Sequence, residues 1–185
     1  MDEFAFDEVV RANWADFAGL FESRGGPKSC WCMAWRGSPA ETRRRDGASR
    51  RAAIKARIDG GTPIGILAYR DGTAVGWCSI APRETYRRLG GPDDQRMSEC
   101  VWSVACFFIK REFRSQGLMR KLLGAAIEHA RRRGATVVEA YPVDPGSPSY
   151  RFMGFVDAFA DAGFQEVGTA GLRRHVMRLA VADHS

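Results

Sequence analysis

The chain has 185 residues and a net charge of +6, which is enough for one domain with its own core. No apolar run approaches the ~20 residues that span a bilayer, which argues against a membrane protein. The opening MDEFAFDEVV is acidic and unlike a signal peptide, and the five cysteines are an odd number, so we expect one cytoplasmic domain over residues 1–185 with free thiols.

The first 60 residues are predicted to form an N-terminal helical region. Apolar side chains recur at helical intervals between residues 4 and 23, and Gly25-Gly26-Pro27 ends that run. The aromatic segment CWCMAWR, residues 30–36, is predicted as a strand or a tight extended segment. Cys30 and Cys32 are more closely spaced than the two ligands of a typical half metal site. The chain has no CxxC or HxxxH pair elsewhere to complete such a site, so no metal is expected.

A basic helix is expected next. Ser38, Pro39 and Glu41 have the spacing of a capping box, and the helix that follows is interrupted at Gly47 before it ends near residue 60. Residues 36–57 contain eight basic and two acidic side chains, an excess equal to the net charge of the whole chain. This cluster fits either a solvated helix face or a surface for a phosphate-bearing or acidic partner.

The rest of the chain is predicted to alternate between strands and helices. A hairpin turns at Asp71-Gly72, a long polar loop covers residues 83–100, and a strand–helix–strand unit follows it. Such a unit places its two strands parallel through a right-handed crossover. The expected segments are 63–82, 100–109, 118–133, 136–143, 152–159, 164–167 and 173–181. The fold class is therefore α/β, with a mixed sheet of six to seven strands flanked by helices on both faces.

The junction REFRSQGLMRKLL, residues 111–123, has the features of a phosphate site. A helix N-terminus offers free N–H groups and a partial positive charge, and Gly117 lets an anion approach the backbone because it has no β-carbon. Arg114 and Arg120 add positive charge at the rim. The junction is neither a Walker loop nor a GxGxxG dinucleotide fingerprint.

The sequence CFFIKREFRSQGLMRKLL resembles motif A of the GNAT superfamily of acyl-CoA-dependent N-acetyltransferases. Arg114, Gly117 and Met119 fall on its three signature positions, although a small residue is usual where Met119 stands. YRFMGFVDAFADAGFQEV resembles the second signature, in which Gly163-Phe164 closes a helix, and HVMRLAV resembles the last strand. The resemblance covers roughly residues 63–181.

This resemblance implies a GNAT-like fold with a V-shaped opening between the fourth and fifth strands. Acetyl-CoA would be the co-substrate, with its pantetheine along one strand and its pyrophosphate on the next turn. A backbone N–H near Phe107 would polarise the thioester carbonyl. The implied cofactor-binding residues are Phe107, Phe108, Ile109, Arg114, Ser115, Gln116, Gly117, Leu118, Met119 and Arg120.

The catalytic groups are less clearly marked. The family often supplies a tyrosine acid four residues before the Gly of Gly-Phe, a position that is Phe159 here. In this chain Tyr141 or Tyr150 would take the place of that acid. Alternatively, the departing thiolate leaves without a proton or receives one from water. The amine must also lose a proton, for which the candidate bases are Glu139, Asp144, Glu84 and Glu99. Cys106 is expected to be a buried, inert thiol.

The sequence therefore predicts an N-acetyltransferase that acts on a primary amine of a small molecule or peptide by direct attack in a ternary complex. The resemblance also makes a homodimer possible. One alternative, which the phenylalanine at position 159 keeps open, is a non-catalytic acyl-CoA-binding domain. The other is a nucleic-acid-binding module built on residues 43–57, against which no helix-turn-helix, zinc finger or RNP motif is found.

Overall fold

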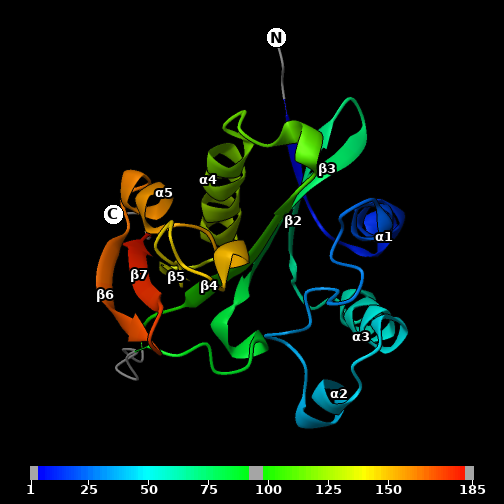
Figure 1. The fold of residues 1–185 in the computed structure, drawn as a ribbon, viewed down its shortest axis with the longest axis horizontal. Coiled ribbons are helices and arrows are strands. Elements are labelled where there is room, and N and C mark those ends of the chain that lie inside the picture. The colour runs from blue at the N-terminus through cyan, green and yellow to red at the C-terminus, as the bar shows by residue number, and fades with distance from the viewer. Residues whose placement is uncertain (1–3, 92–97, 182–185) are drawn as a thin grey trace.

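The structure, a computed structural model, describes residues 4–91 and 98–181. A seven-stranded sheet in the order β1-β2-β3-β4-β5-β7-β6 forms its centre (Figure 1). The strands are β1 Ala5–Glu8, β2 Gly65–Arg70, β3 Thr73–Pro82, β4 Val101–Ile109, β5 Val137–Ala140, β6 Gln165–Ala170 and β7 Arg174–Ala180. Only the β4–β5 pair is parallel, which confirms the expected mixed sheet.

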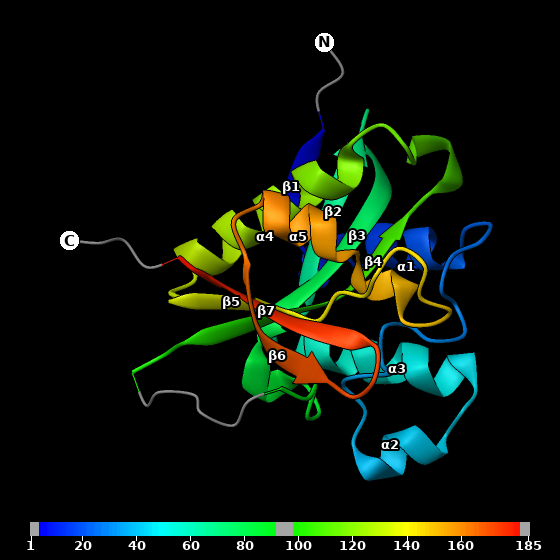
Figure 2. The ribbon, with the colours of Figure 1, turned by 60° about the vertical axis from the view of Figure 1, so that its left-hand side comes forward.

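Helices cover both faces of this sheet, as expected. They are α1 Trp14–Glu22, α2 Pro39–Arg43, α3 Gly47–Asp59, α4 Leu118–Arg132 and α5 Val156–Asp161. In Figure 1, α1 and α3 lie on one side of the sheet, whereas α4 and α5 lie on the other. The β6–β7 hairpin completes the sheet beyond β5 (Figure 2). No helix in residues 4–91 and 98–181 has both the length and the hydropathy to cross a membrane.

Each face of the sheet has its own core. Leu118, Leu122 and Ala126 recur every four residues along α4, so they share one side of the helix and are buried against the sheet. On the opposite face, Phe17 of α1 meets Trp77 of β3 with ring centroids 5.0 Å apart. Burial of a side chain of this size contributes about 1.5–3 kcal/mol to folding.

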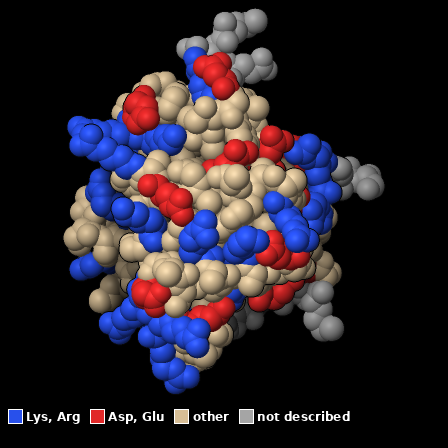
Figure 3. Space-filling view, turned by 90° about the vertical axis from the view of Figure 1, so that its right-hand side faces the viewer, with Lys and Arg blue, Asp and Glu red and all other residues tan. Residues whose placement is uncertain are grey.

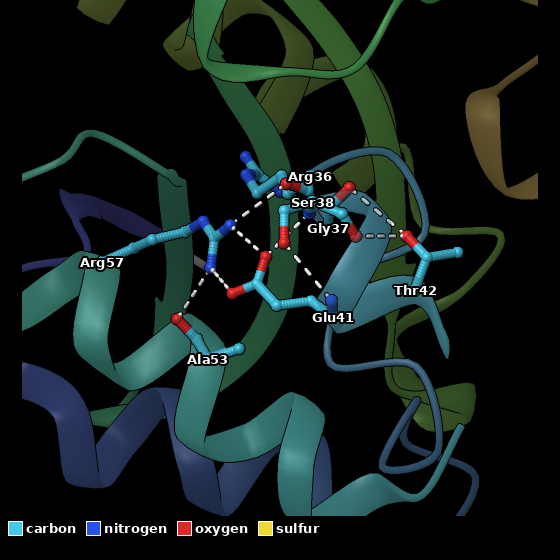
Figure 4. Close-up of polar contacts among 7 residues, drawn as sticks. All are labelled: Arg36, Gly37, Ser38, Glu41, Thr42, Ala53 and Arg57. Carbon is cyan, nitrogen blue, oxygen red and sulfur yellow. Dashed lines mark hydrogen bonds and ion pairs between the residues drawn. The ribbon is translucent and has the colours of Figure 1, made fainter. Parts of the chain in front are cut away.

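The α2–α3 corner is built by the predicted capping box, which the structure confirms (Figure 4). Ser38 Oγ accepts from the Glu41 N–H, and Glu41 Oε2 accepts from the Ser38 N–H. Arg57 on α3 donates to both Glu41 oxygens, at 2.9 and 2.8 Å, and also to the Arg36 carbonyl. Hydrogen bonding from Arg57 lowers the pKa of Glu41 to about 2. This ion pair therefore anchors the segment that precedes α2 to α3.

Three local predictions were wrong. Residues 5–8 form an edge strand rather than helix, because the free edge of β2 supplies backbone partners to them. Residues 30–36 form successive turns rather than a strand, and both Trp31 and Cys32 adopt a positive φ, at 49° and 56°. The last helix begins at Val156, after a 3₁₀ turn over residues 151–153. In each case the apolar spacing was compatible with more than one backbone period.

Candidate active site

The turn between β4 and α4 is open toward solvent at its glycine. Gly117 is the N-cap of α4 with φ 74°, and no side chain caps this end of the helix. A β-carbon placed on Gly117 would meet nothing within 4 Å. Ser115 also has a positive φ, 61°, so the turn forms a concave run of backbone N–H groups. In the described chain no acceptor is found for the N–H groups of residues 115–119. Such a turn can hold an anion.

The side chains around this turn are held in defined places. Arg114 Nε donates to the Ile109 carbonyl at 2.8 Å, and Gln116 Nε2 donates to the Glu112 carbonyl at 2.7 Å. Arg120 forms a 2.5 Å ion pair with Asp161 of α5 at the surface. The implied pyrophosphate contacts would therefore come mainly from the backbone, with Arg114 at the rim.

Met119, the departure from the usual small residue, points into the protein. Its side chain is partly buried and packs against the core on the inner side of α4. A β-carbon on Gly154 would lie 3.2 Å from Met119 Cε and 2.7 Å from the Phe159 ring, so this glycine makes room for both side chains. The bulky side chain at position 119 therefore leaves the outer surface of the turn open.

The sheet opens between β4 and β5. The two strands pair only from Val101 to Val104 on β4 and from Val137 to Ala140 on β5. Residues 105–109 continue β4, and residues 106–109 remain paired with β3 on their other side. The chain after β5 instead bridges Val143 to Phe155 and Arg174. One edge of β4 is thus left for another partner, as the resemblance implied for Phe107, Phe108 and Ile109. Figure 2 shows the chain that follows β5, in yellow, turning across this end of β4.

A small apolar cavity lies beside the same stretch of β4. Its volume is about 280 Å³. It is lined by the turns of residues 27–36, by the end of β4 and by the 151–153 turn. The lining residues are Pro27, Cys30, Cys32, Ala34, Trp35, Arg36, Ala105, Cys106, Phe107, Phe108 and Phe152. We call it the apolar cavity. None of these described lining residues is a carboxylate.

The three candidate catalytic residues have different surroundings. Tyr150 has a positive φ of 59° and is 38% exposed, with its ring 6.4 Å from Trp35 and 6.3 Å from Phe152. Both neighbours line the apolar cavity, so Tyr150 lies next to the cavity, although it is not one of its lining residues. Tyr141 is fully buried and donates a hydrogen bond to Glu139, and burial raises the pKa of this phenol.

Glu139 is also fully buried, and strong donors surround it. Arg178 Nε donates to it at 2.6 Å, and Arg83 Nε lies 3.5 Å away. The structure thus brings Glu139 and Tyr141 together but leaves Tyr150 apart from them. A carboxylate engaged in this way has the surroundings of a structural ion pair.

The remaining candidate bases lie away from the apolar cavity. Asp144 Oδ1 lies 3.1 Å from His175 Nε2, and Glu99 Oε2 lies 3.6 Å from Arg178 Nη1. Glu84 borders a groove beside Tyr86 and α2. Phe159 is buried against Phe107, with ring centroids 6.2 Å apart, so the position of the family's tyrosine contributes packing and no hydroxyl.

Sequence reasoning placed Arg36 in the basic surface cluster, whereas the structure buries it at 4% exposure. Its guanidinium donates to Cys32, to the Ile64 carbonyl at 2.6 Å and to the Tyr86 hydroxyl at 2.9 Å. The Tyr86 hydroxyl lies 2.9 Å from Ser79 Oγ. Arg36 follows an aromatic run, and that position was the only sequence signal of its burial.

Four of the other seven basic cluster members make local contacts. Arg57 binds Glu41, Arg51 lies 3.0 Å from Glu22, Lys55 lies 2.6 Å from Asp59, and Arg50 donates to the Ser29 carbonyl at 2.8 Å. Figure 3 shows Lys and Arg over the face formed by α1, α2 and α3, with acidic side chains interspersed. This face is opposite to α4, so the cluster lies across the sheet from the Gly117 turn.

A mixed sheet opened at its parallel pair, with an uncapped helix at the following turn, is the arrangement that the motif resemblance implied for an acyltransferase. The family model of the acetyltransferase (GNAT) family matches residues 27–155. The chain belongs to this family. No curated protein sequence matches it significantly.

Solved structures share the fold over almost the whole chain. yncA from Salmonella typhimurium, solved with its cofactor acetyl-CoA, is 18% identical with a TM-score of 0.58, and the match covers 99% of this chain and 96% of that one. Ribosomal-protein-S5-alanine acetyltransferase from Vibrio fischeri is 12% identical with a TM-score of 0.59, over 100% and 97% of the two chains. Ribosomal-protein-S18-alanine N-acetyltransferase from Escherichia coli is 11% identical with a TM-score of 0.55, over 99% and 97%. At these identities the likeness concerns the fold alone.

Proposed function

We propose that the protein transfers the acetyl group of acetyl-CoA to a primary amine of a small molecule or peptide, by direct attack in a ternary complex. The observation that carries this proposal is the free edge of β4 beyond Val104, immediately before the open turn at Gly117. Structural neighbours that acetylate ribosomal-protein alanines support an amine acceptor.

The Gly117 turn fits the diphosphate of the co-substrate. The N–H groups of residues 115–119 have no acceptor in the described chain, and the partial positive charge of α4 adds to them. Arg114 supplies a formal charge at the rim. Bound there, acetyl-CoA supplies an activated acetyl thioester, and the free edge of β4 would orient its pantetheine through backbone hydrogen bonds.

The apolar cavity is the proposed acceptor site. It reaches Phe107, whose backbone N–H is the expected donor to the thioester oxygen, so an amine in the cavity lies on the attacking side. Because none of the described lining residues is a carboxylate, we propose that the amine gives its proton to water. Tyr150, whose ring is close to two residues of the cavity wall, is the proposed acid for the departing thiolate, in place of the residue missing at position 159.

The phenylalanine at position 159 favours one competing function, a domain that binds acyl-CoA without transferring it. The nucleic-acid reading has less support, because Arg36 is buried and the cluster members described above have local partners. The two remaining functions share the Gly117 turn and differ only in the chemistry at the apolar cavity.

A screen of primary amines with detection of free thiol tests the proposal. Acetyl-CoA at sub-millimolar concentration should raise the melting temperature, and at least one amine should release thiol above the background hydrolysis. Stabilisation by acetyl-CoA without release by any amine would support the non-catalytic domain. No stabilisation by acetyl-CoA or CoA, together with stabilisation by short DNA, would contradict both.

A further inference from the structure

Among the described residues, the buried guanidinium of Arg36 has no carboxylate partner. Its hydrogen bonds go to the Cys32 carbonyl at 3.2 Å, the Cys32 sulfur at 3.3 Å, the Ile64 carbonyl and the Tyr86 hydroxyl. Its Nε has no acceptor in the described part of the chain. A buried charge is costly unless an opposite charge accompanies it. The Cys32 sulfur and the Tyr86 oxygen are the only groups among these partners that can become anions.

Of these two, Cys32 is the group that ionises. Burial raises the pKa of Tyr86 beyond the physiological range, so its hydroxyl stays neutral. A hydrogen bond from Cys106 and the charge of Arg36 lower the pKa of Cys32 to about 5, although burial opposes them. The same hydrogen bond and burial raise the pKa of Cys106, which therefore keeps its proton. The result is a thiolate 3.3 Å from a guanidinium nitrogen, with the Cys106 thiol in the wall of the same cavity.

The pair is reachable from outside. Cys30, Cys32 and Cys106 line the apolar cavity, whereas Cys78 is fully buried on β3 and does not line it. A small oxidant in the cavity therefore meets a thiolate with a second thiol beside it. Low-pKa thiols with a resolving cysteine nearby are the groups that peroxides oxidise selectively.

We propose that Cys32 and Cys106 form a peroxide-sensitive thiol pair that closes to a disulfide at the apolar cavity. The Cys32 thiolate attacks one oxygen of a hydroperoxide, so an S–O bond forms, the O–O bond breaks and an alkoxide or hydroxide leaves. Cys106 then attacks the Cys32 sulfenic acid: the S–S bond forms, the S–O bond breaks, and hydroxide takes the Cys106 proton as water. Each sulfur loses one electron, and the peroxide accepts two.

The disulfide changes the cavity in two ways. It removes the negative charge that accompanies Arg36, and it ties the turns of residues 27–36 to β4. The Gly117 turn lies outside the cavity and is unchanged. If the cavity is the acceptor site, a part that rests on the proposed function, oxidation lowers acetyl transfer while binding of CoA persists, and a thiol reductant restores transfer.

Mass spectrometry after peroxide treatment and alkylation tests the chemistry directly. We expect a disulfide that joins the peptides of Cys32 and Cys106. Cys106→Ser should instead give a dimedone adduct on Cys32. The matched controls are Cys30→Ser, in the same cavity, and Cys100→Ser, exposed on the surface, and both should retain the disulfide. A disulfide through Cys30, or peroxide modification no faster at Cys32 than at Cys100, would overturn the proposal.

A second measurement uses the unaltered protein. The rate of alkylation by iodoacetamide at Cys32, divided by that at Cys100, should rise as the pH falls from 9 to 6, because only a thiolate of low pKa stays reactive. A constant or falling ratio would contradict the thiolate assignment. Both measurements stand without any acetylation assay, so a failure of the proposed function and a failure of the thiol pair are distinguishable.

Discussion

Glu139 of β5 and Arg178 of β7 stand directly opposite each other in the antiparallel register, and Arg178 Nε lies 2.6 Å from Glu139 Oε2. Tyr141 and Arg83 approach the other carboxylate oxygen. The carboxylate is fully buried, so its charge is balanced inside the protein rather than by water. This cluster joins β5 to β7 next to the point where β4 and β5 part.

We predict that Glu139→Gln destabilises the protein by about 3 kcal/mol, because it removes the fully buried carboxylate 2.6 Å from Arg178 and leaves that guanidinium with the longer 3.6 Å contact to Glu99. The measurement is the free energy of unfolding in urea. Glu128→Gln is the control, since it removes an exposed carboxylate from an ion pair with Arg131 and should leave stability almost unchanged. A stable Glu139→Gln protein that has lost all acetyl transfer would instead identify Glu139 as the base.

The Gly117 turn gives a prediction with an internal control. Gly117 and Gly134 lie at the two ends of α4, both with positive φ, 74° and 90°, and a β-carbon on either would meet nothing within 4 Å. Alanine at each position should cost about 1–2 kcal/mol of stability through backbone strain. Only Gly117→Ala should also weaken binding of CoA, by roughly tenfold.

Isothermal titration of CoA into the two variants separates strain from loss of the site. Equal dissociation constants in Gly117→Ala and Gly134→Ala would show that the turn at Gly117 does not hold the co-substrate. Equal losses of stability with a difference in CoA binding would support the proposed placement.

The elements that the sequence predicted well are those with one dominant local signal. Asp71-Gly72 specifies a tight turn because both residues accept positive φ, and the structure has 49° and 74° there. The Ser38 capping box and the four-residue repeat from Leu118 are equally local. The turn at Gly117 was also found, because a glycine between an apolar strand and an amphipathic helix is visible in the chain.

The parts that were missed depend on distant partners. Phe6 is in a strand only because β2 has a free edge, and Arg36 is buried only because Ile64 and Tyr86 supply acceptors. Cys32, in a turn before α2, and Cys106, on β4, line the same cavity although more than seventy positions of sequence separate them. No periodicity within either segment indicates this proximity, so only the tertiary structure reveals it.

Tyr150 and Tyr141 were equal candidates for the acid, and the structure separates them. Tyr150→Phe keeps the ring against Trp35 and removes only the hydroxyl. We predict that this variant lowers kcat by about 10²-fold, with CoA binding unchanged. Tyr141→Phe loses a buried hydrogen bond to Glu139 and should cost about 1 kcal/mol of stability while retaining most of kcat. Steady-state kinetics and urea unfolding of both variants distinguish the two tyrosines. A normal kcat for Tyr150→Phe would show that Tyr150 is not the acid.

His175 links three segments and makes part of the stability dependent on pH. Its Nδ1 lies 3.0 Å from Glu166 on β6, and its Nε2 lies 3.1 Å from Asp144 after β5. Hydrogen bonds to Glu166 and then Asp144 raise the pKa of His175 in the folded protein. The imidazolium is therefore favoured by folding, and its contribution is fully present below the unfolded pKa of about 6.5. It is lost as the pH rises through the higher folded value.

We predict that the stability advantage of the unaltered protein over His175→Gln is larger at pH 6 than at pH 8.5. His129 is the matched control with the opposite sign, because burial lowers its pKa and its neutral form is favoured in the fold. The stability advantage of the unaltered protein over His129→Gln should accordingly be larger at pH 8.5 than at pH 6, because folding opposes the protonation of His129. Urea unfolding at the two pH values measures both differences. Parallel slopes for the two variants would show that the Glu166–His175–Asp144 contacts do not persist in solution.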